Sequence, residues 1–190
     1  MASKCVCSCR GAYDNMISRT ANGLNVRNYT CLIRMDDYVV ETELFSKDAL
    51  EAYSNYNLEK PVVAAHKTYF SETRGGKQGD YRQGMKAKVE NVIDCLRRFP
   101  ESKRAVITIC NEPSPHHTSD DDAKCCRELH FWIDGQSLNA TVLFRAQAAQ
   151  IFPKNIHFIG AIMDEVCKGV GGLQRGELFY HATILVADRR

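Results

Sequence analysis

The stretch KCCRELHFWIDGQSLNATVLFRAQAAQIFPKNIH, residues 124–157, decides how this chain folds. Residues 128–134 alternate between apolar and polar side chains, Gly135 follows, and residues 138–145 form a second half-apolar run. This pattern predicts two antiparallel strands joined by a tight turn. Asn155 then precedes apolar residues at helical spacing, so a helix is expected to begin there.

The same stretch contains groups that can do chemistry. Cys125 and Cys126 enter the first strand, and Arg145 ends the second. A thiolate nucleophile needs a nearby cation to lower its pKa from about 8.5, and Arg127 and Arg145 are available for this by sequence, although Arg127 can also be a solvated side chain. A Cys-Cys pair can equally be incidental. Asn155 can cap the helix or can present an amide donor and acceptor to one edge of a heterocycle.

The remaining elements follow from periodicity, Gly and Pro. Strands are expected at residues 29–33, 38–45 and 178–187, and in the apolar run that leads to residue 110. Helices are expected at residues 46–56, from residue 83 or 84 to Phe99, and from the helix start at 153–155 to Gly169. Five or six strands with helices on one sheet face make an α+β fold. Residues 1–28 are interpreted as a loose N-terminal arm, and residues 29–190 as a single domain.

Composition excludes some classes of protein. The chain has 190 residues, is 44% hydrophobic and 25% charged, and its net charge is +2, so bulk electrostatic binding to nucleic acid or to an acidic membrane is not expected. The nine cysteines are odd in number, and the first residues lack the apolar core of a secretory signal. No run approaches the roughly 20 apolar residues of a membrane span. We therefore expect reduced thiols in a cytoplasm.

Three polar clusters have more than one interpretation. The C-x-C-x-C run at residues 5–9 can bind a soft metal or can be an unliganded tail. Residues 116–122, HHTSDDD, do not match a tetrahedral metal pattern and indicate a solvated acidic loop. Lys103 and Arg104, just before a strand, can bind phosphate or can form an exposed basic turn.

Taken in order, these features resemble a known pattern. Lys103-Arg104 precedes a strand, Cys125-Cys126 precedes the hairpin at residues 131–138, Arg145 follows it, and Pro153-Lys154-Asn155-Ile156 opens a helix. Over roughly residues 80–187 the chain is similar to the thymidylate synthase superfamily, which includes the pyrimidine-nucleotide hydroxymethylases of nucleoside-antibiotic pathways.

The resemblance implies a fold and a mechanism. It implies helices on one face of a mixed sheet, and a homodimer formed sheet to sheet. Cys125 would add to C6 of a pyrimidine ring, Arg145 would bind the substrate phosphate and hold the thiolate, and Asn155 would bind the amide edge of the ring. Lys103 and Arg104 would reach the phosphate in the partner subunit.

The chain also departs from the family at several positions. Cys126 replaces the family's His, Ala146 its Ser, and Ala148 the Asp that contacts folate, while the sugar-binding positions fall near Leu185 and Ala187. The chain also stops before the family's C-terminal segment that closes over folate.

These departures argue against ordinary deoxyuridylate methylation. Methylene-tetrahydrofolate remains the candidate one-carbon donor, and Glu43 and Glu41 are candidates for the general acid or base. The resemblance then implies covalent addition to a pyrimidine nucleotide or analogue, with C5 one-carbon transfer in specialised metabolism.

Two other interpretations stay open. The chain can be a non-catalytic, dimeric, small-ligand-binding relative, or a thiol or metal sensor that uses its N-terminal cysteines.

Overall fold

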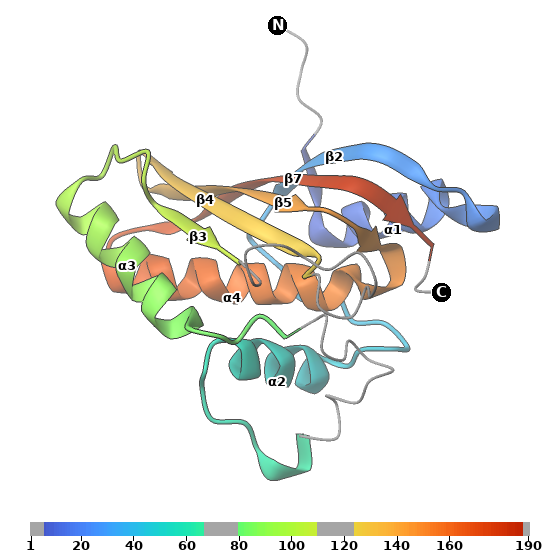
Figure 1. Ribbon diagram of the computed structural model, residues 1–190, viewed down its shortest axis with the longest axis horizontal. Coiled ribbons are helices and arrows are strands. Elements are labelled where there is room, and N and C mark those ends of the chain that lie inside the picture. Colours follow the sequence, from blue (N-terminus) through green and yellow to red (C-terminus); the bar gives the residue numbers. More distant parts are fainter. Residues whose placement is uncertain (1–5, 67–79, 110–123, 188–190) are drawn as a thin grey trace, which may run out of the picture.

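The computed structural model describes residues 6–66, 80–109 and 124–187 of the chain. Figure 1 shows a curved sheet with the helices gathered on one of its faces. In the described ranges the elements are, in chain order, β1 (Val6–Ser8), α1 (Cys9–Arg19), β2 (Val26–Arg34), α2 (Lys47–Asn57), α3 (Met85–Arg98), β3 (Val106–Thr108), β4 (Cys126–Asp134), β5 (Ser137–Phe144), β6 (Gln147–Ala148), α4 (Phe152–Val170) and β7 (Gln174–Val186).

The sheet is mixed, with strand order β1-β2-β7-β5-β4-β3 and β6 added beside β7. β1 and β2 are parallel, as are β5 and β7, whereas the pairs β2–β7, β4–β5 and β3–β4 are antiparallel. The α+β class is therefore confirmed. The seven described strands exceed the expected five or six because β1 and β6 have only three and two residues, too few to show a period.

The β4–β5 hairpin forms as its sequence predicts. Asp134 pairs with Ser137, so the turn holds two residues, and Gly135 adopts a φ of +58°, which a side chain would strain. Leu129 and Phe131 point into the core from β4. The hairpin thus presents one apolar face to the helices.

Helix α4 is the centre of the helix layer, and α2 and α3 pack against it. Pro153 lies in its first turn, where the missing N–H is not needed, and the helix ends before Gly171, whose φ is +87°. At Gly160 an added Cβ would lie 2.2 Å from the Tyr38 ring, so glycine is required for this close approach.

The expectation of a loose arm at residues 1–28 is wrong for its described part. Ser8 caps α1 by accepting a hydrogen bond from the Gly11 N–H at 3.0 Å, and Cys9, Ala12 and Met16 are buried along one helix face. β1, α1 and β2 form a parallel β-α-β unit. The apolar stripe was missed because it has only three members, one of which is a cysteine.

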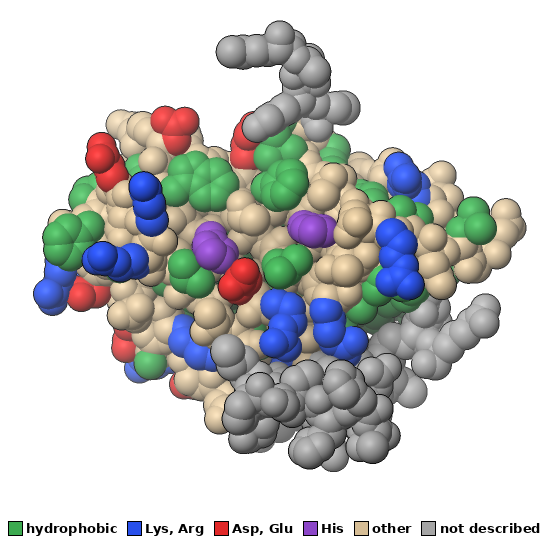
Figure 2. All heavy atoms as spheres, turned by 45° about the horizontal axis from the view of Figure 1, so that its top comes forward, with side chains coloured by type: hydrophobic (Ala, Val, Ile, Leu, Met, Phe, Trp, Pro, Cys, Tyr) green, Lys and Arg blue, Asp and Glu red, His purple; other side chains and the backbone are tan. Residues whose placement is uncertain are grey.

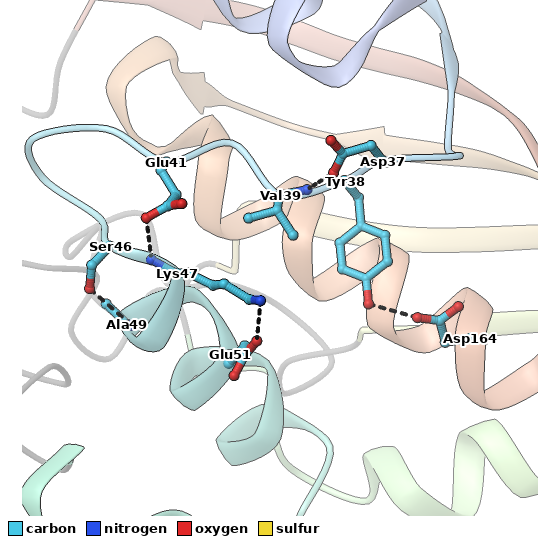
Figure 3. Close-up of polar contacts among 9 residues, drawn as sticks. All are labelled: Asp37, Tyr38, Val39, Glu41, Ser46, Lys47, Ala49, Glu51 and Asp164. Carbon is cyan, nitrogen blue, oxygen red and sulfur yellow. Dashed lines mark hydrogen bonds and ion pairs between the residues drawn. The ribbon is translucent and has the colours of Figure 1, made fainter.

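The strand expected at residues 38–45 is also wrong. Thr42 and Phe45 exchange backbone hydrogen bonds with each other at 3.0 and 3.2 Å, so this segment makes a local turn in place of a ladder. Its aromatic residue serves as an anchor, because the Tyr38 hydroxyl donates to Asp164 on α4 at 2.7 Å (Figure 3).

The other described elements lie where the sequence predicts them. Ser46 caps α2 through the Ala49 N–H at 3.3 Å, and Gly84 precedes α3. β2, β3 and β7 contain or overlap the strands expected at residues 29–33, before 110 and at 178–187. The acidic loop at residues 116–122 lies outside the described residues.

Candidate functional site

The hairpin places Cys125 and Arg145 side by side, just before β4 and just after β5. The backbone N–H of Arg145 donates to the Cys125 carbonyl at 2.8 Å. The Nε–H of the Arg145 guanidinium donates to the Lys124 carbonyl at 3.3 Å. All three residues are half-buried. The hairpin therefore brings the guanidinium of Arg145, twenty residues after Cys125, back to the strand end that carries the two thiols.

The two adjacent thiols lie in different surroundings. Cys126 is 1% exposed, and its N–H donates to the Tyr81 hydroxyl at 3.3 Å. Burial, followed by the charge of Cys125, raises the pKa of the Cys126 thiol far above its usual value. Cys125 is half-buried at the edge of the core. Of the two, Cys125 is the sulfur that a ligand can reach.

An aromatic wall with a buried cation lies on the helix side of the thiols. The Tyr81 ring stacks on Phe158 at 5.7 Å, Tyr53 meets Phe158 edge-on at 6.2 Å, and the Lys154 ammonium lies 4.8 Å from the Tyr53 ring centre. Lys154 is only 2% exposed. Burial, and then neighbours that include Cys126 and Cys125, raise the pKa of Tyr53. The thiols therefore lie close enough to Tyr53 for their charge to affect its pKa.

A cluster of buried amides and a phenol joins β6, α4 and β7. Asn155 Nδ2 donates to Gln147 Oε1 at 2.9 Å, and the Tyr180 hydroxyl donates to the same oxygen at 2.5 Å. Asn155 is 4% exposed and Gln147 1%. The remaining Asn155 oxygen, Oδ1, is buried and has no hydrogen-bond partner among the described residues. Such an orphaned acceptor is rare, and it can accept a hydrogen bond from a ligand.

Burial raises the pKa of the Tyr180 phenol, with Cys126 and then Cys125 next among the causes. The thiol pair thus lies close enough to this cluster to affect its charge. Sequence analysis selected Cys125, Arg145 and Asn155 but missed Gln147, Lys154 and Tyr180. In the sequence, Gln147 stands out only as an amide between alanines. Lys154 stands out only as a charged residue at the start of an apolar helix.

Lys103 and Arg104 lie elsewhere in the chain. Both are exposed on the turn before β3 and line a shallow hollow of about 650 Å³. Val106 pairs with His130 in the antiparallel β3–β4 ladder, so this turn lies toward the far end of β4 from Cys125. At about 3.3 Å per residue the separation along β4 is roughly 20 Å. Within one chain, these two cations are not part of the site.

Glu41 and Glu43 also belong to other surroundings. The Glu41 carboxylate accepts the Lys47 N–H at 3.0 Å and so caps α2, as Figure 3 shows. Glu43 is exposed, and its charge acts on the Tyr13 phenol of α1, whose pKa is raised mainly by burial. The structure gives Glu41 a capping role and brings neither carboxylate into the described contacts around Asn155.

The sheet face opposite the helices carries a second feature of interest. Two rows of outward side chains cross it from strand to strand, and their members are Val106, His130, Thr141, Phe179 and Leu32 in one row and Thr108, Glu128, Leu143, His181 and Thr30 in the other. Trp132 and Phe179 are 41% and 40% exposed there. Figure 2 shows hydrophobic and histidine side chains gathered on this face.

Comparison with known proteins assigns no family, since no family model matches the chain and no curated protein is significantly similar to it. None of the described helices has both the length and the apolar content needed to cross a bilayer. In the same residue ranges, no group of three or more His, Cys, Asp or Glu side chains is placed to hold a metal ion.

Proposed function

We propose that this protein is a divergent, thymidylate synthase-like enzyme in which Cys125 adds covalently to a pyrimidine nucleotide or a related small molecule. The observation that carries the proposal is the hairpin contact that fixes Arg145 beside Cys125. The guanidinium, held at this strand end by the Lys124 carbonyl, is a cation that can bind a substrate phosphate.

The reaction step follows from this arrangement. The Cys125 thiolate attacks C6 of the ring, and the electron pair of the C5=C6 bond moves onto the C4 carbonyl as an enolate. The enolate takes a proton at C5. Loss of the other C5 proton and expulsion of the thiolate restore the ring, so the net result without any donor is exchange of the C5 hydrogen with water.

Asn155 defines which ring edge would be bound. One Nδ2 hydrogen already bonds to Gln147, and the orphaned Oδ1 is an acceptor without a partner among the described residues. That oxygen would accept from a donor such as a ring N–H or an exocyclic amine. The site should therefore reject a ring that presents only acceptors along this edge, because Oδ1 would then stay buried and unpaired.

The described residues do not fit a folate cofactor. Ala148, at the position where the family has its folate-contacting Asp, lies in β6 and offers only a methyl group. Leu185, near a family sugar-binding position, is fully buried in the sheet. The proposed chemistry is therefore addition by Cys125 without methylene-tetrahydrofolate.

The proposal includes a homodimer formed between the uncovered sheet faces. An interface there would cover Trp132 and Phe179 and would give Lys103 and Arg104 a partner subunit to reach, since neither lies at the site of its own chain. Sheets pack face to face at about 10 Å through such mixed rows. Phe179→Glu should convert a dimer to a monomer in light scattering, whereas Val63→Glu, at an exposed residue in the segment that follows α2 on the helix side, should not.

The test of the enzyme proposal is C5 hydrogen exchange. The protein is incubated in D₂O with UMP, CMP or dUMP, and a gain of one mass unit at C5 is followed by mass spectrometry. Exchange that is lost in Cys125→Ser and kept in Cys95→Ser supports the mechanism. Cys95 is a suitable control because it is also half-buried but bonds to Ser102 away from the hairpin.

A non-catalytic ligand-binding role is the second candidate. It is favoured by Gln147, which already occupies one half of the Asn155 amide. A nucleotide that raises the melting temperature and protects Cys125 from alkylation, but whose C5 hydrogen does not exchange, would support this role. A ligand at 100 times its dissociation constant adds about 2.7 kcal/mol of stability, which a thermal scan detects.

A further inference from the structure

Two cysteines at the opposite edge of the sheet touch each other. Cys7 on β1 and Cys31 on β2 have their sulfurs 2.7 Å apart, and both are half-buried. A disulfide requires about 2.05 Å between sulfurs, so the bond needs a further approach of only about 0.7 Å. Neither cysteine is disulfide-bonded in this structure.

The fold explains the contact. β1 and β2 are parallel, with Cys7 opposite Ile33, and Cys31 lies two residues before Ile33 on the same face of β2. Side chains two residues apart on a strand share a face, so both sulfurs point toward α1. Gly11 of α1 lies next to Cys7, because a Cβ at that position would be 3.7 Å from the Cys7 Cβ, an ordinary contact distance.

A nearby thiol provides a contrast. Cys9 is fully buried, and its sulfur contacts the Arg34 carbonyl at 3.6 Å and Met35 Sδ at 3.8 Å. Burial, with the charge of Asp37 next, raises the pKa of the Cys9 thiol to about 12. Cys9 is therefore shielded from oxidants, whereas Cys7 and Cys31 are within reach of a small one.

The geometry points to a redox modification site: Cys7 and Cys31 form a reversible disulfide when a peroxide is present. Peroxide oxidises one thiol to a sulfenic acid and releases one water. The second thiol attacks the sulfenic sulfur, the S–S bond forms, and a second water leaves. Two electrons pass from the two thiols to the peroxide, and a dithiol reductant reverses the reaction by exchange.

The bond would fix a short strand to the sheet. β1 has only three residues, and a disulfide from Cys7 to Cys31 closes a ring that contains all of α1. Closing a loop of this length restricts the unfolded chain, and for a chain of this size a rise of roughly 5–10 °C in Tm is expected. The proposal does not depend on the chemistry of Cys125.

Peptide mapping tests the bond directly. The reduced full chain is treated with a small excess of hydrogen peroxide in the presence of EDTA, remaining thiols are alkylated, and trypsin is added without reductant. Cleavage yields peptides 5–10 and 28–34, which contain Cys7 and Cys31. The expected product is these two peptides joined, two mass units below their sum, and separated again by dithiothreitol.

Variants identify the sulfurs. The joined peptides should persist in Cys5→Ser and Cys9→Ser and disappear in Cys7→Ser and Cys31→Ser. The proposal is overturned if Cys7 and Cys31 stay fully alkylatable, if peptide 5–10 joins another peptide in preference, or if the product survives in Cys7→Ser. Peroxide should raise Tm in the wild type but not in Cys31→Ser, and an equal Tm change in both would overturn the stapling role.

Discussion

Two regions of the sheet each contain a pair of cysteines. One pair is adjacent in the sequence but differs in burial, and the other is distant in the sequence but in contact. Cys125 and Cys126 are chain neighbours, yet one is half-buried and the other is sealed in the core. Cys7 and Cys31 are 24 residues apart, yet their sulfurs touch. Neighbours along a strand point to opposite faces, whereas neighbours across strands share one. A pair that is obvious in the sequence is therefore the one that the fold separates.

The regions also differ in what surrounds the reachable sulfur. At the hairpin end, the Arg145 backbone bonds to the Cys125 carbonyl and its guanidinium bonds to the Lys124 carbonyl, so a cation lies at the strand end that carries the reachable sulfur. At the N-terminal edge, Cys7 has another sulfur as its neighbour, which suits oxidation. In each region a second, buried thiol (Cys126 or Cys9) is held in its protonated form by burial. The burial and the neighbouring groups of each thiol therefore determine how it can react.

The largest expected effect that tests this contrast is on alkylation rates. The pKa of about 12 at Cys9 makes its thiolate fraction at pH 8 about a thousandfold lower than that of a thiol at the ordinary 9.0. Cys9 and Cys126 should therefore react far more slowly with iodoacetamide than the half-buried Cys7 and Cys125, measured for each cysteine by tandem mass spectrometry. Equal alkylation rates for Cys9 and Cys7 would contradict the conclusion that burial protects Cys9 and leaves Cys7 reachable.

Acid should destabilise the packing of α4 on α2 around His157. His157, on α4, is 4% exposed and shares a 2.7 Å hydrogen bond with Ser54; burial lowers its pKa to about 4. Between pH 6.5 and 4 the unfolded imidazole binds a proton that the folded one does not, so stability falls as pH falls through this window. The loss by pH 4 is about 3 kcal/mol.

The measurement is urea unfolding at pH 7 and pH 4 in wild type and in His157→Gln, whose own loss between the two pH values should be smaller by about that amount. Residues 1–34 contain no histidine, so amide exchange of β2 should follow only the global loss. A steeper acid sensitivity in β2 than in α4 would contradict this assignment.

Helices and strands were predicted correctly where the apolar residues repeat over a long enough stretch to show helical or strand periodicity. The hairpin, α3 and α4 each span eight or more residues with one apolar face, and their positions were predicted. α1 was missed because its stripe has three members, and residues 38–45 were misassigned because Tyr38 packs on α4 and not in a ladder. Local patterns do not specify which distant surface a side chain contacts.

The same limit applies to the candidate site. The two-residue turn brings Arg145 back to the strand end that carries the thiols, but its register alone would place Arg145 opposite Cys126. The irregularity between Cys126 and Glu128 shifts the pairing, so that Arg145 bonds to Cys125. Gln147 bonds to Asn155 eight residues later and to Tyr180 thirty-three residues later, and Cys7 meets Cys31 through a parallel pairing. Both contacts depend on how β1 and β7 dock in the sheet, which no local pattern encodes.

A medium-sized effect is expected at the amide cluster. Gln147→Leu removes the acceptor shared by Tyr180 and Asn155 and leaves two buried polar groups unpaired, so stability should fall by about 2 kcal/mol. Gln136→Leu is the matched control, because that side chain is exposed on the hairpin turn and should change stability by no more than about 0.5 kcal/mol. Equal losses in chemical denaturation would show that the cluster is not a specific network.

The smallest expected effect compares one phenol from each region. Tyr180 is fully buried and donates to Gln147, whereas Tyr29 is 5% exposed and donates to Asn15 on α1 at 3.1 Å. Tyr180→Phe should cost about 1 kcal/mol, because Gln147 Oε1 keeps only its bond to Asn155 in a dry core. Tyr29→Phe should cost about 0.5 kcal/mol, because Asn15 is exposed and water can replace the hydroxyl. Urea titrations of both variants measure the order, and a larger loss at Tyr29 would show that the N-terminal edge, not the hairpin end, holds the more demanding polar contact.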